Sequence, residues 1–428
     1  MTTQEIVMAT QESNTLRAQI LSELEAIKTV DCHSHTQLRR EYYAVGGFDL
    51  FTMTSYFERD IATTAGGPIY EGATTDEERW KRLKAVLGKS RNVSYWRHNL
   101  TVYQELFGLK DPELTDENWR QVNETIRTRT RDPAWYDYIT RHICKLETQV
   151  RNIPWFEDWE PEYFTAILRM ESALELHRGE TRKGLEAYLD TSIDSLNAAK
   201  KALADLTERY VQRGAIGIKL AHAYGRTLHS LPVPDDRAAT LFERALRKEE
   251  LTASEVKELQ DHVIFYLGGL ADEMKLIFQI HTGVQGNWGH IPDSDPLLLI
   301  PLLKAFPDVR FDLFHAGYPY SRMLGMLGKH YPNVWLNMAW MYVISIAASR
   351  QILSEWIDLV PGYRILGFGS DVGFPEMIYG HLQMARSCVA DVLTSKVERD
   401  FLSEEEALHL ARKLFRENGV EFYGIAQR

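Results

Sequence analysis

The sequence predicts an α/β protein, a distorted (β/α)8 TIM barrel, from three observations on its 428 residues. Nearly continuous apolar runs recur along the chain, as in parallel strands that are buried on both faces. Amphipathic helical segments alternate with these runs, which is typical of βα units. Ionisable side chains follow several of the runs directly, at the strand ends where a barrel builds its active site.

The expected elements follow in order along the chain. Residues 16–27 have helical spacing and lead into the strand-like run TVDCHSH. Residues 50–160 are rich in Trp, Tyr, Arg and Glu and show no clear buried strand, which predicts a helical insertion within a single domain of residues 1–428. About six strands can be placed directly, and closure into a barrel requires two more that the sequence does not locate. The strand candidates after the insertion are FTAILRM (164–170), AIGIKLA (215–221), LIFQIH (276–281), RFDLFH (310–315), VWLNMAW (334–340) and ILGFGSD (365–371).

Composition and charge exclude several classes of protein. The net charge of -11 argues against a nucleic-acid partner, because duplex binding needs clustered Lys and Arg, but it allows a small anionic substrate. No run approaches about 18 apolar residues, so we expect no membrane span. Cys32, Cys144 and Cys388 are too few and too far apart for a disulfide framework, which predicts a cytoplasmic protein. The aromatic-rich insertion is also compatible with a homo-oligomer.

Side chains that can bind a metal ion mark the ends of the predicted strands. In DCHSHTQ, His33 and His35 are two residues apart, so a strand would direct both imidazoles to the same face. Because the carboxyl ends of parallel strands open on one face of a barrel, we expect side chains from distant parts of the sequence to surround one point there. The residues at these positions are His33, His35, Lys219, His281, His315 and Asp371.

Imidazole and carboxylate groups together predict a site for a divalent metal, with Zn²⁺ favoured and iron or manganese as alternatives. A catalytic zinc takes about three protein ligands and keeps a position open for water. His33, His35, His281 and Asp371 could supply these ligands, or Asp371 could instead act as a base. A bound ion would lower the pKa of that water to about 7 and so make it nucleophilic.

Further residues are candidates for contacts with substrate. Arg39, Arg40 and Arg169 could hold a carboxylate, because a guanidinium group binds it in bidentate fashion. Trp288 and Trp340 are candidates for the wall of the pocket. Other histidines near the strand ends are interpreted as ordinary loop residues, namely His222, His229 and His290.

On these residues the sequence resembles the amidohydrolase superfamily of metal-dependent hydrolases, over residues 28–40 and roughly 214–420. The stretches DCHSH, GIKLA, FQIHTG, FHAGYPY, YPNVWLN and GFGSDVGFPE are most similar to its amidohydrolase-2 branch. The resemblance implies that His33, His35 and Asp371 are metal ligands, and it favours His281 as a further one. His315 would bind a second ion or polarise the substrate. Lys219 would be carboxylated and bridge two ions in a two-metal member, and in a one-metal member it can stay unmodified.

A second likeness lies in residues 95–108, YWRHNLTVYQELFG, which with the following LTDENW resemble the helical insertion of uronate isomerases in the same superfamily. Those enzymes typically carry an Arg soon after the Asp of strand eight, where this chain has Val372 and Gly373. Hydrolysis is therefore the main expectation. In this reaction an activated water attacks the C=O carbon of an amide, lactone or ester in a small polar substrate, with or without a carboxylate, while Asp371 moves the proton and His315 polarises the oxygen.

The alternatives are non-hydrolytic chemistry or no chemistry. Decarboxylation of an aromatic acid and uronate isomerisation are the two non-hydrolytic reactions that the same site could perform. A binding protein with a structural metal is disfavoured, because structural zinc sites are usually closed and rich in Cys, whereas the predicted ligands lie at a barrel mouth.

Overall fold

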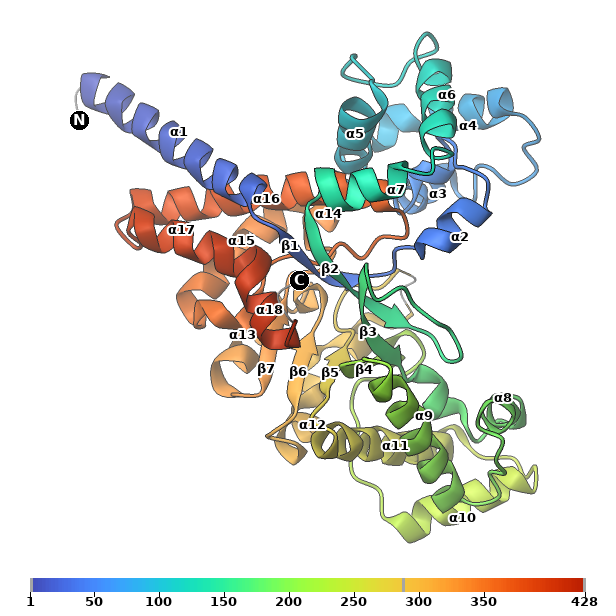
Figure 1. The fold of residues 1–428 in the computed structure, drawn as a ribbon. Coiled ribbons are helices and arrows are strands. Elements are labelled where there is room, and N and C mark those ends of the chain that lie inside the picture. The colour runs from blue at the N-terminus through green and yellow to red at the C-terminus, as the bar shows by residue number, and fades with distance from the viewer. Residues whose placement is uncertain (1–2, 287–288, 426–428) are drawn as a thin grey trace.

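In the computed structural model, which describes residues 3–286 and 289–425, eight parallel strands form one sheet in sequence order, rolled into a nearly closed barrel (Figure 1). The predicted TIM barrel is thereby confirmed. The strands are β1 (Thr29–Ser34), β2 (Leu146–Ile153), β3 (Phe164–Arg169), β4 (Gly217–Leu220), β5 (Ile277–Ile280), β6 (Arg310–Leu313), β7 (Val334–Asn337) and β8 (Ile365–Leu366).

The prediction that residues 50–160 contain no strand is wrong, because β2 lies at residues 146–153. Its sequence, LETQVRNI, mixes charged and amide side chains with apolar ones, yet all eight residues are buried. Its polar side chains find partners on both faces of the strand: Asn152 donates a hydrogen bond to the Gln279 side chain across the barrel at 2.9 Å, and the Glu147 carboxylate accepts one from Arg416 at 3.0 Å. An apolar-run criterion misses a strand of this kind because the barrel interior here is polar and hydrogen-bonded.

The short strands β4 and β5 pair with Gly217 opposite Ile277. A Cβ atom on Gly217 would lie 2.5 Å from the Ile277 carbonyl oxygen, so the glycine permits this close approach. The pairing aligns Lys219 with Gln279 and thereby fixes where the ends of β4 and β5 open.

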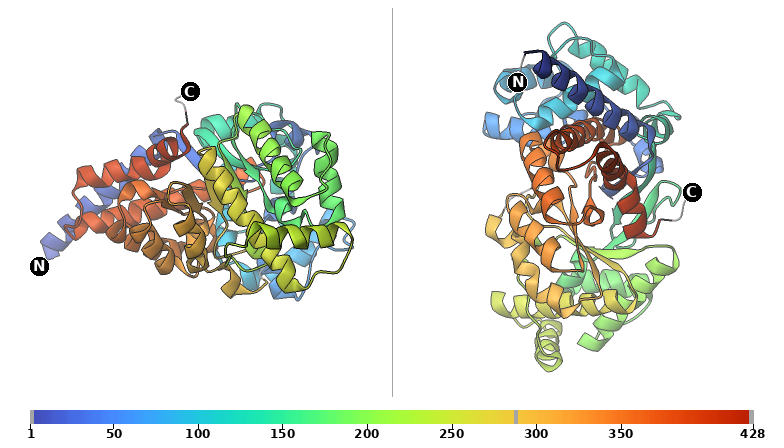
Figure 2. Two further views of the ribbon diagram at one scale, coloured as in Figure 1. Left: turned by 90° about the horizontal axis from the view of Figure 1, so that it is seen from below. Right: turned by 90° about the vertical axis from the view of Figure 1, so that its left-hand side faces the viewer.

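Helices surround the sheet, and those from β3 to β8 connect consecutive strands (Figures 1 and 2). Within the described residues, no helix is long and apolar enough to cross a membrane. These connecting helices are α8 (Gly179–Leu189), α9 (Leu196–Gln212), α10 (Asp235–Leu246), α11 (Ala253–Glu273), α12 (Ile300–Ala305), α13 (Ser321–His330), α14 (Met341–Ile344) and α15 (Ile346–Leu359). The terminal helices are α1 (Thr3–Ala26), α16 (Pro375–Glu398), α17 (Glu404–Arg412) and α18 (Asn418–Tyr423).

The chain between β1 and β2 forms a group of helices, seen together beside α16 in Figure 1. Buried polar contacts join this group to α16: the Glu376 carboxylate accepts hydrogen bonds from the Tyr42 hydroxyl and the Trp135 indole. The group therefore has a fixed position over one side of the barrel. Its helices are α2 (Arg39–Ala44), α3 (Phe57–Ala65), α4 (Asp76–Ser90), α5 (Ser94–Phe107), α6 (Trp119–Arg129) and α7 (Trp135–Asp137).

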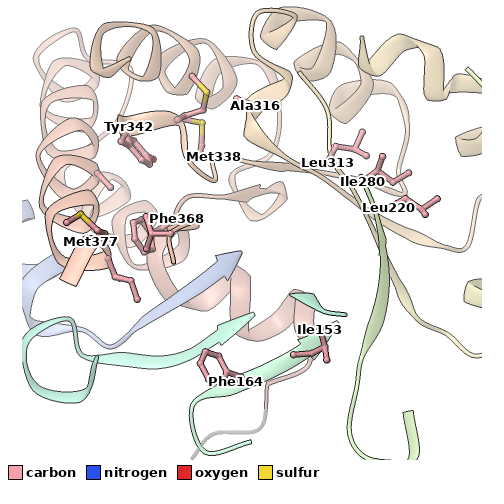
Figure 3. Packing of buried hydrophobic residues seen from close by; sticks show 14 of the residues in the cluster. Ile153, Phe164, Leu220, Ile280, Leu313, Ala316, Met338, Tyr342, Phe368 and Met377 are labelled. Atoms are coloured by element: carbon pink, nitrogen blue, oxygen red, sulfur yellow. The ribbon is translucent and has the colours of Figure 1, made fainter. Parts of the chain in front are cut away.

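Apolar side chains fill the space between the strands and the helices that cover them. Figure 3 shows part of this core, in which Leu220, Ile280 and Leu313 lie at the ends of β4, β5 and β6. Each of the three is fully buried. Packing of this kind holds the strand ends rigidly, so the residues that directly follow the strands have defined positions.

His98 on α5 makes the contact between α5 and α16, and with it the stability of the fold, sensitive to acid. Its Nε2 lies 2.7 Å from the Met377 carbonyl oxygen, and burial lowers the pKa of His98 to about 4. The unfolded chain takes up a proton near pH 6.5, which the folded chain excludes, so stability falls as the pH drops from 6.5 towards 4. We expect this residue to account for a loss of about 2 kcal/mol in unfolding free energy between pH 7 and pH 5.

Urea titrations of His98→Gln and wild-type protein at the two pH values measure this difference. The glutamine amide can still donate to the Met377 carbonyl but does not titrate. His142→Gln, at an exposed position of the same region, is the matched control. An equal acid sensitivity in wild type and His98→Gln would contradict the assignment.

Candidate active site

Three side chains from the two edges of the barrel converge at the carboxyl ends of the strands. The Nε2 atoms of His33 and His35 lie 3.3 Å and 3.4 Å from the same carboxylate oxygen, Oδ1 of Asp371. Donor atoms of all three residues lie within 4.8 Å of one another. We call His33, His35 and Asp371 the metal cradle. The β1 register places the two imidazoles side by side, as the sequence predicts.

The cradle fits a divalent metal ion by the chemistry of its donors. Burial lowers the pKa of His33 and of His35 well below the usual value, so both imidazoles are neutral and have lone pairs to offer. Two imidazoles and one carboxylate on one side of an open cavity match a catalytic site for zinc or a related ion, with coordination positions left for water or substrate.

A buried carboxylate beneath the cradle aligns its two halves. Asp31 Oδ1 accepts a hydrogen bond from the Ser370 amide at 2.7 Å, and Oδ2 accepts one from the Ser370 hydroxyl at 2.5 Å. The Asp371 amide donates to the His33 carbonyl oxygen at 2.9 Å. Burial raises the pKa of Asp31 to about 7, against these hydrogen bonds. Asp31 thus connects the ligands of β1 with the ligand that follows β8.

The backbone is strained at three positions around the cradle. Asp371, His315 and Trp340 have φ angles of 51°, 59° and 68°, in the left-handed region that residues other than glycine avoid. Each such residue costs about 1–3 kcal/mol, so the surrounding fold must hold it there. Strain concentrated at the ends of β6, β7 and β8 supports a functional role for this face of the barrel.

His281 and His315 form a pair beside the cradle. The His315 Nε2 lies 3.0 Å from His281 Nδ1, and the outer nitrogens face the carbonyl oxygens of Val284 (2.8 Å) and Ala339 (3.1 Å). Burial lowers the pKa of both imidazoles, so each neutral ring has one N–H, which it donates to its carbonyl oxygen, and the two facing nitrogens both carry lone pairs. His315 is fully buried behind His281, and its Nε2 lies 3.9 Å from Asp371 Oδ2. This pair therefore lies next to the metal cradle of His33, His35 and Asp371 and is not part of it.

The cradle opens into a cavity of about 550 Å³, which is a normal size for a small-molecule site. Basic side chains from three elements line the cavity: Arg59 on α3, Arg169 at the end of β3 and Lys219 on β4. Glu171 lies between two of them, with its carboxylate 3.2 Å from Arg169 Nε and 3.8 Å from Lys219 Nζ. Burial lowers the pKa of Lys219 to about 8, although Glu171 opposes the shift. Arg169 and Lys219 thus share one carboxylate partner, which leaves the wall around them positive.

Only some of the other residues that the sequence predicts to contact substrate line the cavity. Arg169 and Trp340 line the cavity. Arg39 and Arg40 are not among the described lining residues: the Arg39 side chain contacts Asp137 and the Pro133 carbonyl, and the Arg40 side chain is exposed. Trp288 lies outside the described residues.

Sequence reasoning did not single out three residues that line the cavity, Tyr56, Arg59 and Glu171. Tyr56 and Arg59 come from the helical group between β1 and β2, where Tyr and Arg are too common to stand out. His222, interpreted as an ordinary loop residue, lies in the turn His222–Tyr224 after β4, where it is 5% exposed and lines the cavity. Its position directly after the Lys219 strand was the available signal.

Comparison with known proteins gives a consistent family. A family model described as amidohydrolase matches residues 30–425. The uronate isomerase of Thermotoga neapolitana is 18% identical, with 94% of this chain and 95% of that protein aligned. Protein fluG of Emericella nidulans is 27% identical over 224 residues, which are 50% of this chain, and the chain spans 26% of that longer relative.

Among solved structures, the glucuronate isomerase of Caulobacter crescentus superposes with a TM-score of 0.80 at 17% sequence identity, covering 97% of this chain and 95% of that one. At this identity the likeness concerns the fold, including the arrangement of helices around the strands.

Proposed function

Since the chain belongs to the amidohydrolase family, we propose that it is a metal-dependent isomerase that interconverts the aldose and ketose forms of a small sugar acid such as a uronate. The observation that carries the proposal is the joining, in one cavity, of the metal cradle and a second group, the arginines Arg59 and Arg169. The first would hold the reacting end of the sugar and the second its carboxylate. Two proteins that are similar over nearly their whole length are a uronate isomerase and a glucuronate isomerase.

The surroundings of Lys219 favour one ion rather than two. A carboxylated lysine would bring a second negative group against the Glu171 carboxylate, which lies 3.8 Å from Lys219 Nζ. An unmodified ammonium is instead attracted to Glu171. The three cradle residues would hold this single ion, and His281, whose Nε2 donates to the Val284 carbonyl oxygen, keeps an Nδ1 lone pair that could add a fourth ligand.

Aldose–ketose isomerisation moves one proton from C2 to C1 and another from the C2 hydroxyl to the C1 oxygen. We assign the carbon proton to Asp371, whose Oδ2 is turned away from the His33 and His35 nitrogens. We assign the hydroxyl proton to Lys219, because it lines the cavity and its pKa of about 8 suits a group that both donates and accepts near neutral pH. Both groups return to their starting states. A divalent ion in the cradle would supply polarisation of the adjacent carbonyl and hydroxyl oxygens.

Incubation of the metal-supplemented protein with D-glucuronate and D-galacturonate tests the proposal. We expect a ketose product with the same mass as the substrate, detected by NMR and mass spectrometry, and we expect Asp371→Asn to form none. A folded, metal-loaded protein that leaves every uronate unchanged would contradict isomerisation.

Hydrolysis is the second candidate, and the stretch SDVGFPE favours it, because Val372 and Gly373 follow Asp371 where uronate isomerases typically carry an Arg. In that reaction Asp371 would accept a proton from the attacking water and pass it to the leaving group. Lactones and amides of the same acids distinguish the two reactions, because their hydrolysis products are heavier by one water.

A further inference from the structure

The peptide unit that joins Ser370 to Asp371 is held by hydrogen bonds on both of its sides. Its N–H donates to the His33 carbonyl oxygen of β1 at 2.9 Å, and its C=O accepts a hydrogen bond from His381 Nδ1 on α16, also at 2.9 Å. A trans peptide is planar, with its N–H and C=O pointing in opposite directions, so two such bonds fix the orientation of its plane. The strained φ angle of Asp371, 51°, is the rotation of this residue relative to that plane. The two bonds therefore fix the backbone from which the Asp371 carboxylate extends.

The two carbonyl groups that precede the one of Ser370 are hydrogen-bonded by backbone amides. The Cys32 amide donates to the Phe368 carbonyl oxygen at 3.0 Å, and the Trp340 amide donates to that of Gly369 at 2.9 Å. The carbonyl of Ser370 is bonded by a side chain of α16 instead. A single substitution can therefore remove the hydrogen bond next to the metal ligand and leave these backbone hydrogen bonds in place.

The hydrogen bond to Ser370 is what the imidazole of His381 contributes at its position. The ring is fully buried, and among the described residues its Nε2 has no hydrogen-bond partner. Its neighbours include the aromatic rings of Phe368 and Tyr342, with centroids 5.3 Å and 5.8 Å away. Burial lowers the pKa of His381 to about 3, so the ring is neutral and its one proton is at Nδ1, facing the carbonyl. A leucine would fill this apolar site without leaving a nitrogen unpaired, but it could not hold the carbonyl.

The helix that carries His381 has a fixed position of its own. At the start of α16, Glu376 accepts hydrogen bonds from side chains of α2 and α7. The Met377 carbonyl oxygen faces Nε2 of His98 on α5 at 2.7 Å. Gly380 lies so close to α5 that a Cβ atom would be 2.6 Å from the His98 ring. These contacts anchor the first part of α16, so His381 is a fixed support for the peptide.

We propose that His381 is a positioning residue for metal binding, which holds the Ser370–Asp371 peptide and so keeps the Asp371 carboxylate directed at His33 and His35. This inference rests on the proposed function, because it takes the metal cradle as the site of a divalent ion. Without the hydrogen bond the peptide plane can rotate, and Asp371 can relax out of the left-handed region. Its carboxylate then moves away from the two imidazoles, and the affinity for the ion falls.

Transfer of zinc from the metal-supplemented protein to a fluorescent chelator measures this affinity without turnover. His381→Leu and His381→Asn introduce side chains of similar shape, but only asparagine can donate to the Ser370 carbonyl oxygen. We expect leucine to weaken zinc binding at least about tenfold, as the loss of a group that orients a metal ligand typically does. Asparagine should keep the affinity within about threefold of wild type.

The matched control is His98→Leu, which removes the same kind of hydrogen bond, from a buried imidazole to a carbonyl oxygen, at Met377 of the same helix. Its unfolding free energy should fall, while its zinc affinity stays within about twofold of wild type. Equal zinc affinities of wild type and His381→Leu would overturn the positioning role. Equal weakening in His381→Leu and His98→Leu would also overturn it, because a general loosening of α16 would then be the cause.

Should His381→Leu fail to fold, His381→Met takes its place, because the flexible methionine side chain adapts to the same apolar site. A wild-type protein that binds no zinc, iron or manganese would refute the metal cradle and the proposed function, and the positioning role falls with them. Metal binding by wild type with no difference between the leucine and asparagine variants would refute the positioning role alone.

Discussion

Replacing His33 and His35 together by asparagine is expected to remove both the bound metal and the activity. The two imidazoles supply two of the three donors of the metal cradle, and Asp371 alone cannot retain a divalent ion in competition with water. We expect metal content to fall from about one ion per chain to none, and turnover to fall below about one thousandth of the wild-type rate. Elemental analysis of the purified proteins and the uronate assay measure the two quantities.

The control is a double variant with the same change of composition, His290→Asn together with His330→Asn, since both side chains are exposed. It should keep its metal and its activity. Retention of metal by the His33 and His35 variant would show that the ion is held elsewhere, for example at the His281–His315 pair. Full activity without metal would refute the metal-dependent mechanism.

Replacing Arg169 by methionine is expected to weaken the use of carboxylated substrates about a hundredfold in kcat/KM, from the loss of about 3 kcal/mol of charge-assisted binding. Arg169 ends β3 and lines the cavity on the same side as Lys219. Methionine keeps much of the length of the side chain and removes its charge. Most of the effect should be in KM, because a carboxylate distant from the reacting carbons is bound in the ground state as well as in the transition state.

The matched control is Arg39→Met, in which the same substitution is made at an arginine whose partners are Asp137 and Pro133. Its KM should stay within about twofold of wild type, since the loss of a half-exposed ion pair has a small energetic effect. Equal effects of the two substitutions would mean that general charge, rather than the cavity wall, attracts the substrate. Steady-state kinetics with a uronate separate these cases.

The sequence predicted the barrel because most of its strands are apolar runs, and β5 to β7 are the clearest examples. It missed β2 because polar side chains on both faces of that strand are buried, for example Gln149 and Asn152, and Asn152 is hydrogen-bonded inside the barrel. Burial of such a strand depends on partners from other strands, for example Gln279 on β5. Those partners are not visible from the local pattern.

For the site, the spacing of His33 and His35 was enough to predict the two neighbouring imidazoles, since a strand has a period of two. The convergence of Asp371 on them followed from barrel topology. The positions of Arg39 and Arg59 could not be predicted in this way, because both lie in the helices after β1, whose orientation depends on tertiary packing. The same holds for His222, because its burial is decided by the elements that pack around the turn after β4.

The link between Asp31 and Ser370 has a consequence for the biosynthesis of the protein. These residues are 339 positions apart, and they join the first strand of the barrel to the segment after the last one. Because the cradle takes ligands from both sides of this junction, a nascent chain released only as far as β7 holds two imidazoles and no Asp371. The complete cradle thus forms late, after β8 has left the ribosome and closed against β1, so metal uptake through it reports that the whole barrel has been assembled.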